Sequence, residues 1–76
     1  SLPFQLLAQD RQISGKVVDA ETNTGIPGVS VFIKGTAIGT ITDNNGNYTL
    51  NASNASVLVF QSVGLVSQEI TVGTNS

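Results

Sequence analysis

Cysteine and histidine are both absent from this 76-residue chain. Without cysteine, no disulfide supports the small core of so short a domain, and no thiolate zinc site can form. Without histidine, the chain lacks the usual base for a serine nucleophile and the commonest metal ligand. A serine nucleophile would depend on Lys16 or Lys34, which both lie in alternating runs at positions expected to be exposed. The sequence therefore predicts no catalytic residue, no cofactor site and no metal site.

Charge of either sign is scarce. Only 11% of the residues are charged, and 3 cations against 5 anions give a net charge of −2. The cations Arg11, Lys16 and Lys34 are spread along the sequence, so a basic footprint for nucleic acid is missing. The carboxylates are Asp10, Asp19, Glu21, Asp43 and Glu69. No motif forces two of them together, and those beside loops are expected to be solvated turn formers. We therefore predict neither nucleic-acid binding nor general acid–base catalysis.

The first nine residues, SLPFQLLAQ, differ in composition from the rest of the chain. They are predicted to be either the remnant of an export signal or an N-terminal arm. The small Ala8 suits the last position before a signal-peptide cleavage site, although Leu6 stands where a small residue is usual. Alternatively, Leu2, Phe4 and Leu6 alternate, as one face of a short strand would. In either case the segment is too short to span a membrane, which takes about 20 apolar residues.

No part of the chain shows the 3.6-residue periodicity of a helix. From residue 12 onward, short β-branched runs are separated by turn residues. The clearest turn is residues 43–46, Asp-Asn-Asn-Gly, because Asp suits the first turn position and Asn and Gly tolerate positive φ. The predicted strands are residues 12–19, 29–34, 38–42, 47–51, 57–62 and 68–72. Six or seven short strands at this spacing predict an all-β sandwich.

The apolar side chains suggest which strand is central. Residues 57–60, Val-Leu-Val-Phe, form an unbroken apolar run, which predicts a strand buried on both faces. The four aromatic residues are separated in sequence and lie within apolar runs, so they do not predict a binding platform. We expect Tyr48 and Phe60 to pack in the core.

Residues 35–50 superficially resemble two kinds of ligand-binding loop. An EF-hand loop has glycine at its sixth position and glutamate at its twelfth, whereas counting from Asp43 places Gly46 fourth and Asn54 twelfth. Phosphate loops rely on a helix N-terminus, and none of the glycines here opens a helix. The segment is therefore predicted to be a hairpin whose role is structural.

A series of short motifs follows in order along the chain. They are Ile13-Ser14-Gly15-Lys16-Val17-Val18-Asp19, Gly25-Ile26-Pro27-Gly28-Val29-Ser30-Val31, Lys34-Gly35-Thr36, Gly39-Thr40-Ile41-Thr42-Asp43, Gly46-Asn47-Tyr48, Ser62-Val63-Gly64-Leu65 and Gln68-Glu69-Ile70. Each motif alone is weak, but the ordered set resembles the carboxypeptidase regulatory-like (peptidase-associated) domain family. The resemblance implies a small transthyretin-like, Greek-key β-sandwich, with residues 1–9 outside it and residues 10–76 forming the domain.

Within that family the chain is most similar to the N-terminal extension of SusC/RagA-type TonB-dependent outer-membrane transporters. One departure is Leu65, where that subgroup usually carries an aromatic residue. The resemblance implies a non-catalytic domain of a longer exported protein, on the periplasmic side of the outer membrane of a Gram-negative bacterium. It also implies protein partners, either the rest of the same transporter or periplasmic coupling proteins, with no membrane insertion by this segment itself.

Two other functions remain open from the sequence. The same family pattern allows an accessory domain of an exported carboxypeptidase-like hydrolase or of a surface protein. A carbohydrate-binding module is the third possibility. If the domain binds a partner strand, an unpaired sheet edge is the physically favoured surface, but the sequence does not show which strand lies at an edge.

Overall fold

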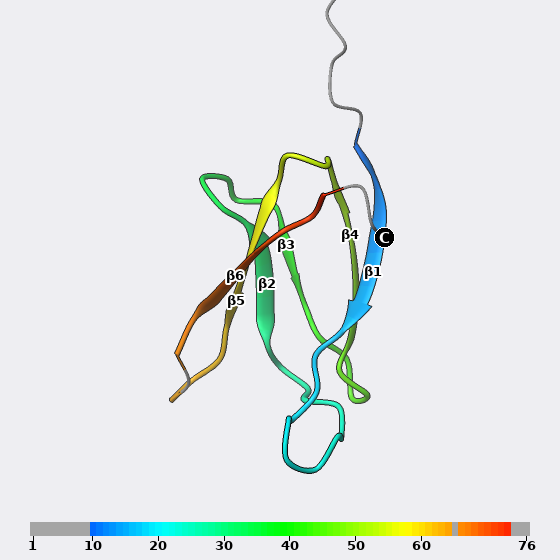
Figure 1. Cartoon of the computed structure of the whole chain (residues 1–76), viewed down its shortest axis with the longest axis vertical. Coiled ribbons are helices and arrows are strands. Elements are labelled where there is room, and N and C mark those ends of the chain that lie inside the picture. The colour runs from blue at the N-terminus through cyan, green and yellow to red at the C-terminus, as the bar shows by residue number, and fades with distance from the viewer. Residues whose placement is uncertain (1–9, 65, 74–76) are drawn as a thin grey trace, which may run out of the picture.

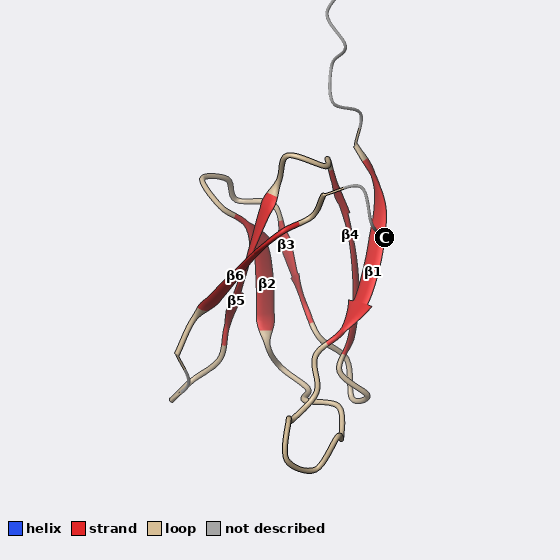
Figure 2. Cartoon of the chain, in the orientation of Figure 1, coloured by secondary structure: helices blue, strands red, loops and turns tan. Residues whose placement is uncertain are grey.

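The computed structural model describes residues 10–64 and 66–73. Those residues form six strands and no helix (Figure 2). The strands are β1 (Arg11–Lys16), β2 (Ser30–Ile33), β3 (Gly39–Ile41), β4 (Asn47–Ala52), β5 (Val57–Gln61) and β6 (Gln68–Thr71). All six predicted strands are present, and the all-β prediction is confirmed. No helix suited to crossing a membrane occurs in this part of the chain.

The strands form two antiparallel sheets that face each other (Figure 1). One sheet pairs β1 with β4, and the other has the strand order β3-β2-β5-β6. The central pair of the larger sheet is β2 with β5. This pairing joins the first half of the chain to the second half. The predicted β-sandwich is confirmed.

In the smaller sheet, buried and exposed side chains alternate along each strand, as in a sheet with one solvent-exposed face. Ile13 lies opposite Leu50, and both side chains are buried between the sheets. On the other face every residue of both strands is exposed and polar. The facing pairs there are Gln12 with Asn51, Ser14 with Thr49, and Lys16 with Asn47. A strict period of two therefore fixes which side of this sheet packs on the core.

The larger sheet buries side chains on both faces of β5. Leu58 is 3% exposed on the inner face, and its neighbour Val59 is 6% exposed on the outer face. Val59 lies opposite Phe32 of β2 and Glu69 of β6. The prediction that this strand is buried on both faces is confirmed for its two middle residues. The core is small, and Val31 is its largest completely buried side chain.

The first strand is shorter than predicted. Residues 12–19 were expected to be one strand, but β1 ends at Lys16. The Val17 amide still follows the β1–β4 register and donates to the Gly46 carbonyl at 2.8 Å, but the Val17 carbonyl accepts from the Ile26 amide, and Val18 forms an isolated bridge with Gly25. Alternation continues through residues 17–19, and periodicity alone therefore extends the strand too far.

The predictions for residues 1–9 lie outside the described residues. The two alternatives for that segment, a signal remnant or an N-terminal arm, therefore both stand as predictions. Leu65, the departure from the subgroup, also lies outside the described residues, and the division of the chain between residues 9 and 10 stays a prediction.

Candidate functional site

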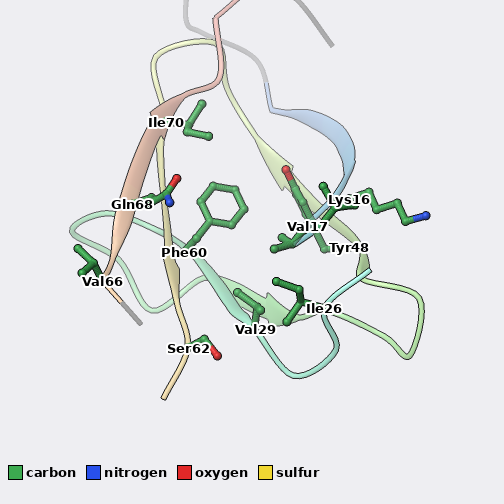
Figure 3. Close-up of a pocket in the computed structure, with 11 residues that line it drawn as sticks. Lys16, Val17, Ile26, Val29, Tyr48, Phe60, Ser62, Val66, Gln68 and Ile70 are labelled. Atoms are coloured by element: carbon green, nitrogen blue, oxygen red, sulfur yellow. The ribbon is translucent and has the colours of Figure 1, made fainter. Parts of the chain in front are cut away.

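An open apolar groove runs between the two sheets on one side of the sandwich (Figure 3). On the opposite side β3 lies next to β4. The groove has a volume of about 340 Å³ and lies between β1 and β6. Its main apolar lining is Val17, Ile26, Val29, Tyr48, Phe60 and Ile70. We call this surface the β1–β6 groove.

An aromatic pair joins the two sheets across the groove. The rings of Tyr48 on β4 and Phe60 on β5 have centroids 5.6 Å apart and an interplanar angle of 71°, an edge-to-face arrangement. Gly15 lies opposite Tyr48 on β1, and a Cβ atom on Gly15 would collide with the tyrosine ring. Both aromatic rings pack on the core, as predicted, yet both remain half-buried because one side faces the groove.

Burial raises the pKa of the Tyr48 hydroxyl above its ordinary value of about 10. The folded state therefore favours the neutral phenol. We expect this contribution to stability to be complete below about pH 10 and lost as the pH rises through the folded-state pKa. Tyr48 is the only tyrosine, so ultraviolet absorbance reports its ionisation directly. The titration midpoint should be higher in buffer than in denaturant.

Two control measurements make this expectation specific to Tyr48. The variant Tyr48→Phe keeps the ring but removes the ionisable hydroxyl, so the part of the alkaline destabilisation due to Tyr48 should disappear. Equal titration midpoints for the native chain in buffer and in denaturant would show that the hydroxyl is not held in the partly buried position between the sheets.

The turn at residues 43–46 is closed by the Asp43 side chain. Its Oδ1 atom accepts hydrogen bonds from the amides of Asn45 at 2.8 Å and Asn47 at 3.0 Å. The Gly46 amide donates to the Asp43 carbonyl at 2.9 Å. The predicted Asp-Asn-Asn-Gly turn is confirmed, and backbone amides donate to its carboxylate. The predicted hairpin is wrong, because β3 pairs with β2 and β4 pairs with β1, so the turn joins strands of two different sheets.

This turn interlocks with the loop that follows β1. The Gly46 carbonyl accepts from Val17, and the Val17 carbonyl accepts from the Ile26 amide at 2.9 Å. A Cβ atom on Gly46 would collide with the Val17 carbonyl, and one on Gly25 would collide with the Asn45 carbonyl. Glycine at both positions therefore lets the two backbones approach closely. The interlock also places Val17 and Ile26 on the floor of the groove.

A buried threonine supports the groove floor from behind. Thr42 is 4% exposed, and its hydroxyl donates to the Ile26 carbonyl at 2.7 Å while accepting from the Val29 amide at 2.8 Å. Thr42 thereby holds both ends of the Ile-Pro-Gly-Val turn. Because Ile26 and Val29 line the groove, Thr42 positions two residues of its surface without lining it.

Among the described residues, the charged side chains do not gather at the groove. Lys16 contributes to its rim, but Figure 3 shows its ammonium group pointing away from the cavity. Lys34 pairs with Glu69 at 3.1 Å on the outer face of the larger sheet. Asp19 is a turn former, as predicted, since its Oδ1 atom accepts from the Glu21 amide at 2.8 Å. Within residues 10–64 and 66–73, no three Asp or Glu side chains come together as a metal site would require.

The groove was missed by sequence reasoning. Alternation did place Ile70 and Glu69 on opposite faces of one strand, and Ile70 faces the groove. It did not show that Ile70 would stay 54% exposed, or that Val66, which also lines the groove, would be 87% exposed. The distance between two sheets depends on the whole fold, and no local pattern contains it.

Comparison with known proteins identifies the family. The family model of the CarboxypepD_reg-like domain matches residues 13–76, most of the chain. The chain belongs to this family. The carboxypeptidase regulatory-like resemblance of the motifs is confirmed, and the interlocked turns, with their glycines and Thr42, lie within the matched part of this CarboxypepD_reg-like domain.

Three curated relatives contain a similar segment. TonB-dependent receptor P3 of Formosa agariphila is 44% identical over 71 residues, covering 91% of the chain and 7% of that receptor. TonB-dependent receptor P26 of the same organism is 48% identical over 65 residues, covering 86% of the chain and 6% of the receptor. TonB-dependent receptor SusC of Bacteroides thetaiotaomicron is 37% identical over 71 residues, covering 93% and 7%. The CarboxypepD_reg-like domain therefore corresponds to a small part of each relative. No solved structure matches the chain.

Proposed function

We propose that this CarboxypepD_reg-like domain is a non-catalytic accessory domain of a TonB-dependent outer-membrane nutrient transporter and acts through protein contacts on the periplasmic side. The observation that carries the proposal is the similarity of nearly the whole chain to a 6–7% portion of three TonB-dependent receptors. A domain that is a small part of large receptors serves the receptor to which it is joined. Its partners are then the rest of that receptor or the periplasmic proteins that couple to it.

The surface chemistry supports contacts with protein. Apolar side chains stand exposed in and beside the β1–β6 groove, including Ile70 at 54% and Val66 at 87%. The nearby Val63 is fully exposed at the turn between β5 and β6. Exposed apolar side chains that lie together mark an interaction surface. All five carboxylates, in contrast, are exposed, and three of them serve turns or an ion pair, which supports a role without catalysis.

Two single-glycine substitutions in the full-length receptor test this function. Gly46→Ala is expected to unfold the domain, for the reasons argued in the Discussion, whereas Gly35→Ala places its methyl group in open space. We expect the Gly46 variant to reach the outer membrane at the normal level but to take up its nutrient more slowly. The Gly35 variant should transport normally. The measurements are receptor abundance in outer-membrane fractions and initial uptake rates.

Each contrary outcome has a distinct meaning. Normal uptake with an unfolded domain would show that the domain does not contribute to transport. A full-length gene product that is an exported hydrolase would overturn the transporter assignment in favour of the accessory role in an enzyme. Saturable chemical-shift changes at the groove on titration with oligosaccharides would favour the carbohydrate-binding alternative.

A further inference from the structure

One chemically labile pair lies at the centre of the interlocked turns. Asn45-Gly46 is the only Asn-Gly pair in the 76 residues. Asparagine is among the thermally labile residues. A following glycine has no side chain to obstruct the approach of its backbone nitrogen to the asparagine side chain. The pair is therefore the position in this chain most suited to spontaneous deamidation.

Deamidation at this pair needs only water. The backbone nitrogen of Gly46 forms a bond to Cγ of Asn45, the bond from Cγ to the side-chain nitrogen breaks, and ammonia leaves with the proton of the Gly46 amide. Water then opens the five-membered imide ring at one of its two carbonyl carbons. Opening at Cγ gives aspartate. Opening at the backbone carbonyl carbon gives isoaspartate, whose main chain runs through Cγ.

In the folded chain, contacts on both sides hold the peptide group between the two residues. The Gly46 amide donates to the Asp43 carbonyl at 2.9 Å, and the Gly46 carbonyl accepts from the Val17 amide at 2.8 Å. The Asn45 amide donates to Asp43 Oδ1 at 2.8 Å. The Asn45 carbonyl lies against Gly25, where a Cβ atom would collide with it. This peptide group therefore cannot rotate while the turns are interlocked.

The held geometry opposes ring closure. Asn45 is the third residue of a turn closed by the Gly46 amide and is not at positive φ, which places its ψ near 0°. At that angle the Gly46 nitrogen lies on the side of the Asn45 nitrogen, whereas the ring needs it on the side of Cβ. Asn45 is exposed to water, but Gly46 is buried and its amide proton is already donated to Asp43. The labile side chain is thus accessible, and the attacking nitrogen is not.

We propose that Asn45-Gly46 is a modification site that is protected while the two turns are interlocked and deamidates once they open. Isoaspartate at position 45 adds one carbon to the main chain, about 1.5 Å of length, inside the turn that Asp43 closes. It also converts the carbonyl that lies against Gly25 into a charged carboxylate. The modified turn then no longer fits the loop after β1, and the opening becomes irreversible.

The site depends only on the turns of the domain itself. It therefore goes beyond the proposed transporter role and applies to whatever longer protein carries the domain. A domain that stays open is marked chemically and removed from the folded population, whereas a domain that stays closed keeps its asparagine.

Incubating the 76-residue chain at neutral pH, in buffer and in guanidinium chloride, tests the protection. Peptide mapping by mass spectrometry measures the conversion of the Asn45 amide to an acid. Only opened molecules should react, and they make up about one in a thousand or fewer of a folded population. Because the reaction is slow compared with opening and closing, the rate in buffer should be lower by about a hundredfold or more. Asn51 and Asn54, each followed by alanine, are internal controls and should react far more slowly than Asn45 in denaturant.

Two glycine variants keep the reactive pair and differ in the interlock. Gly25→Ala places a Cβ atom against the Asn45 carbonyl and should open the turns, so deamidation in buffer should approach the rate in denaturant. Gly35→Ala places its methyl group in open space and should stay about as protected as the native chain. Hydrogen exchange of the Gly46 amide measures how far the turns are open in each variant, and the deamidation rate should rise with it. Equal rates for the native chain in buffer and in denaturant, or rates unrelated to exchange, would overturn the protection.

Refolding tests the irreversible step. After incubation in denaturant and dilution into buffer, chains with isoaspartate at position 45 should remain unfolded, whereas unmodified chains should refold. Enzymatic methylation of isoaspartate counts the modified chains, and circular dichroism measures the folded fraction. Asn45→Ser has no carbonyl carbon at the reacting position, so this variant should refold fully after the same incubation. Recovery of the native fold by the isoaspartate form would show that the added carbon is tolerated, and the opening would then be reversible.

Discussion

Replacing Gly46 with alanine is expected to leave the chain largely unfolded at room temperature. Gly46 has a φ of +83°, and a residue with a side chain pays about 1–2 kcal/mol in that region. A Cβ atom there would also lie 2.8 Å from the Ile26 amide nitrogen and would collide with the Val17 carbonyl. Those two groups are hydrogen-bonded to each other, so neither can move away freely. The combined loss should exceed about 4 kcal/mol.

That loss is large for a domain of this size. At about 0.05–0.15 kcal/mol per residue, the whole chain is stabilised by about 4–11 kcal/mol, and a small domain without a disulfide lies at the low end of that range. Urea denaturation followed by circular dichroism measures the change. Gly35→Ala is the control, because Gly35 has a φ of +81° but no atom within 4 Å of the added methyl group. It should lose only the conformational term of about 1–2 kcal/mol.

A third glycine separates the two causes. Gly25 is not at positive φ, yet its added Cβ would collide with the Asn45 carbonyl. Gly25→Ala should therefore be severely destabilised by close approach alone. If Gly46→Ala and Gly35→Ala lose the same free energy, the interlock does not constrain the backbone in the way described.

Much of the fold was predictable because strands and turns are local in sequence. The alternation of Ile13 and Gly15 with polar neighbours, and the Asp43–Gly46 turn chemistry, both involve residues within a few positions of one another. Strand ends were less predictable, because beyond Lys16 the Val17 carbonyl and Val18 change partner from β4 to the Gly25–Ile26 segment. A hydrogen bond between separate segments has no signature in either segment alone.

The groove was less predictable than the strands that form it. Tyr48 and Phe60 were correctly expected to pack in the core, since each lies in an apolar run. Whether a core side chain is covered on every side depends on which strands complete the sheets, and this is a property of the topology. Leu58 and Ile70 show this, because they lie opposite each other on neighbouring strands and are both apolar. Leu58 is nevertheless buried, whereas Ile70 is exposed.

The motifs that identify the family and the groove share one structural element. The Gly-Ile-Pro-Gly-Val segment lies against the Asp-Asn-Asn-Gly turn, and its residues Ile26 and Val29 form part of the groove floor. A motif that resembles a ligand loop in sequence thus serves to shape a surface next to it. Variants at the interlock should therefore alter the groove even where they leave the strands in place.

Replacing Thr42 with valine is expected to destabilise the chain by about 2–4 kcal/mol. The substitution preserves shape but removes the hydroxyl that bonds the Val29 amide and the Ile26 carbonyl. Each buried backbone group left without a partner costs about 1–3 kcal/mol. The amide proton of Val29 should also exchange with solvent much faster, because its acceptor is gone. Chemical denaturation and hydrogen exchange measure the two effects separately.

Two controls assign the loss to the buried hydroxyl. Thr42→Ser keeps both hydrogen bonds and loses one methyl group, so it should cost only about 1 kcal/mol. Thr49→Val removes a hydroxyl that contacts Ser14 at 3.3 Å on the exposed face of β4, and should change stability by less than about 0.5 kcal/mol. If Thr42→Val is as stable as Thr42→Ser, the hydroxyl does not hold the turn. Slow exchange of the Val29 amide in the valine variant would show that this amide has another acceptor, and the floor of the groove would then be fixed by the glycine interlock alone.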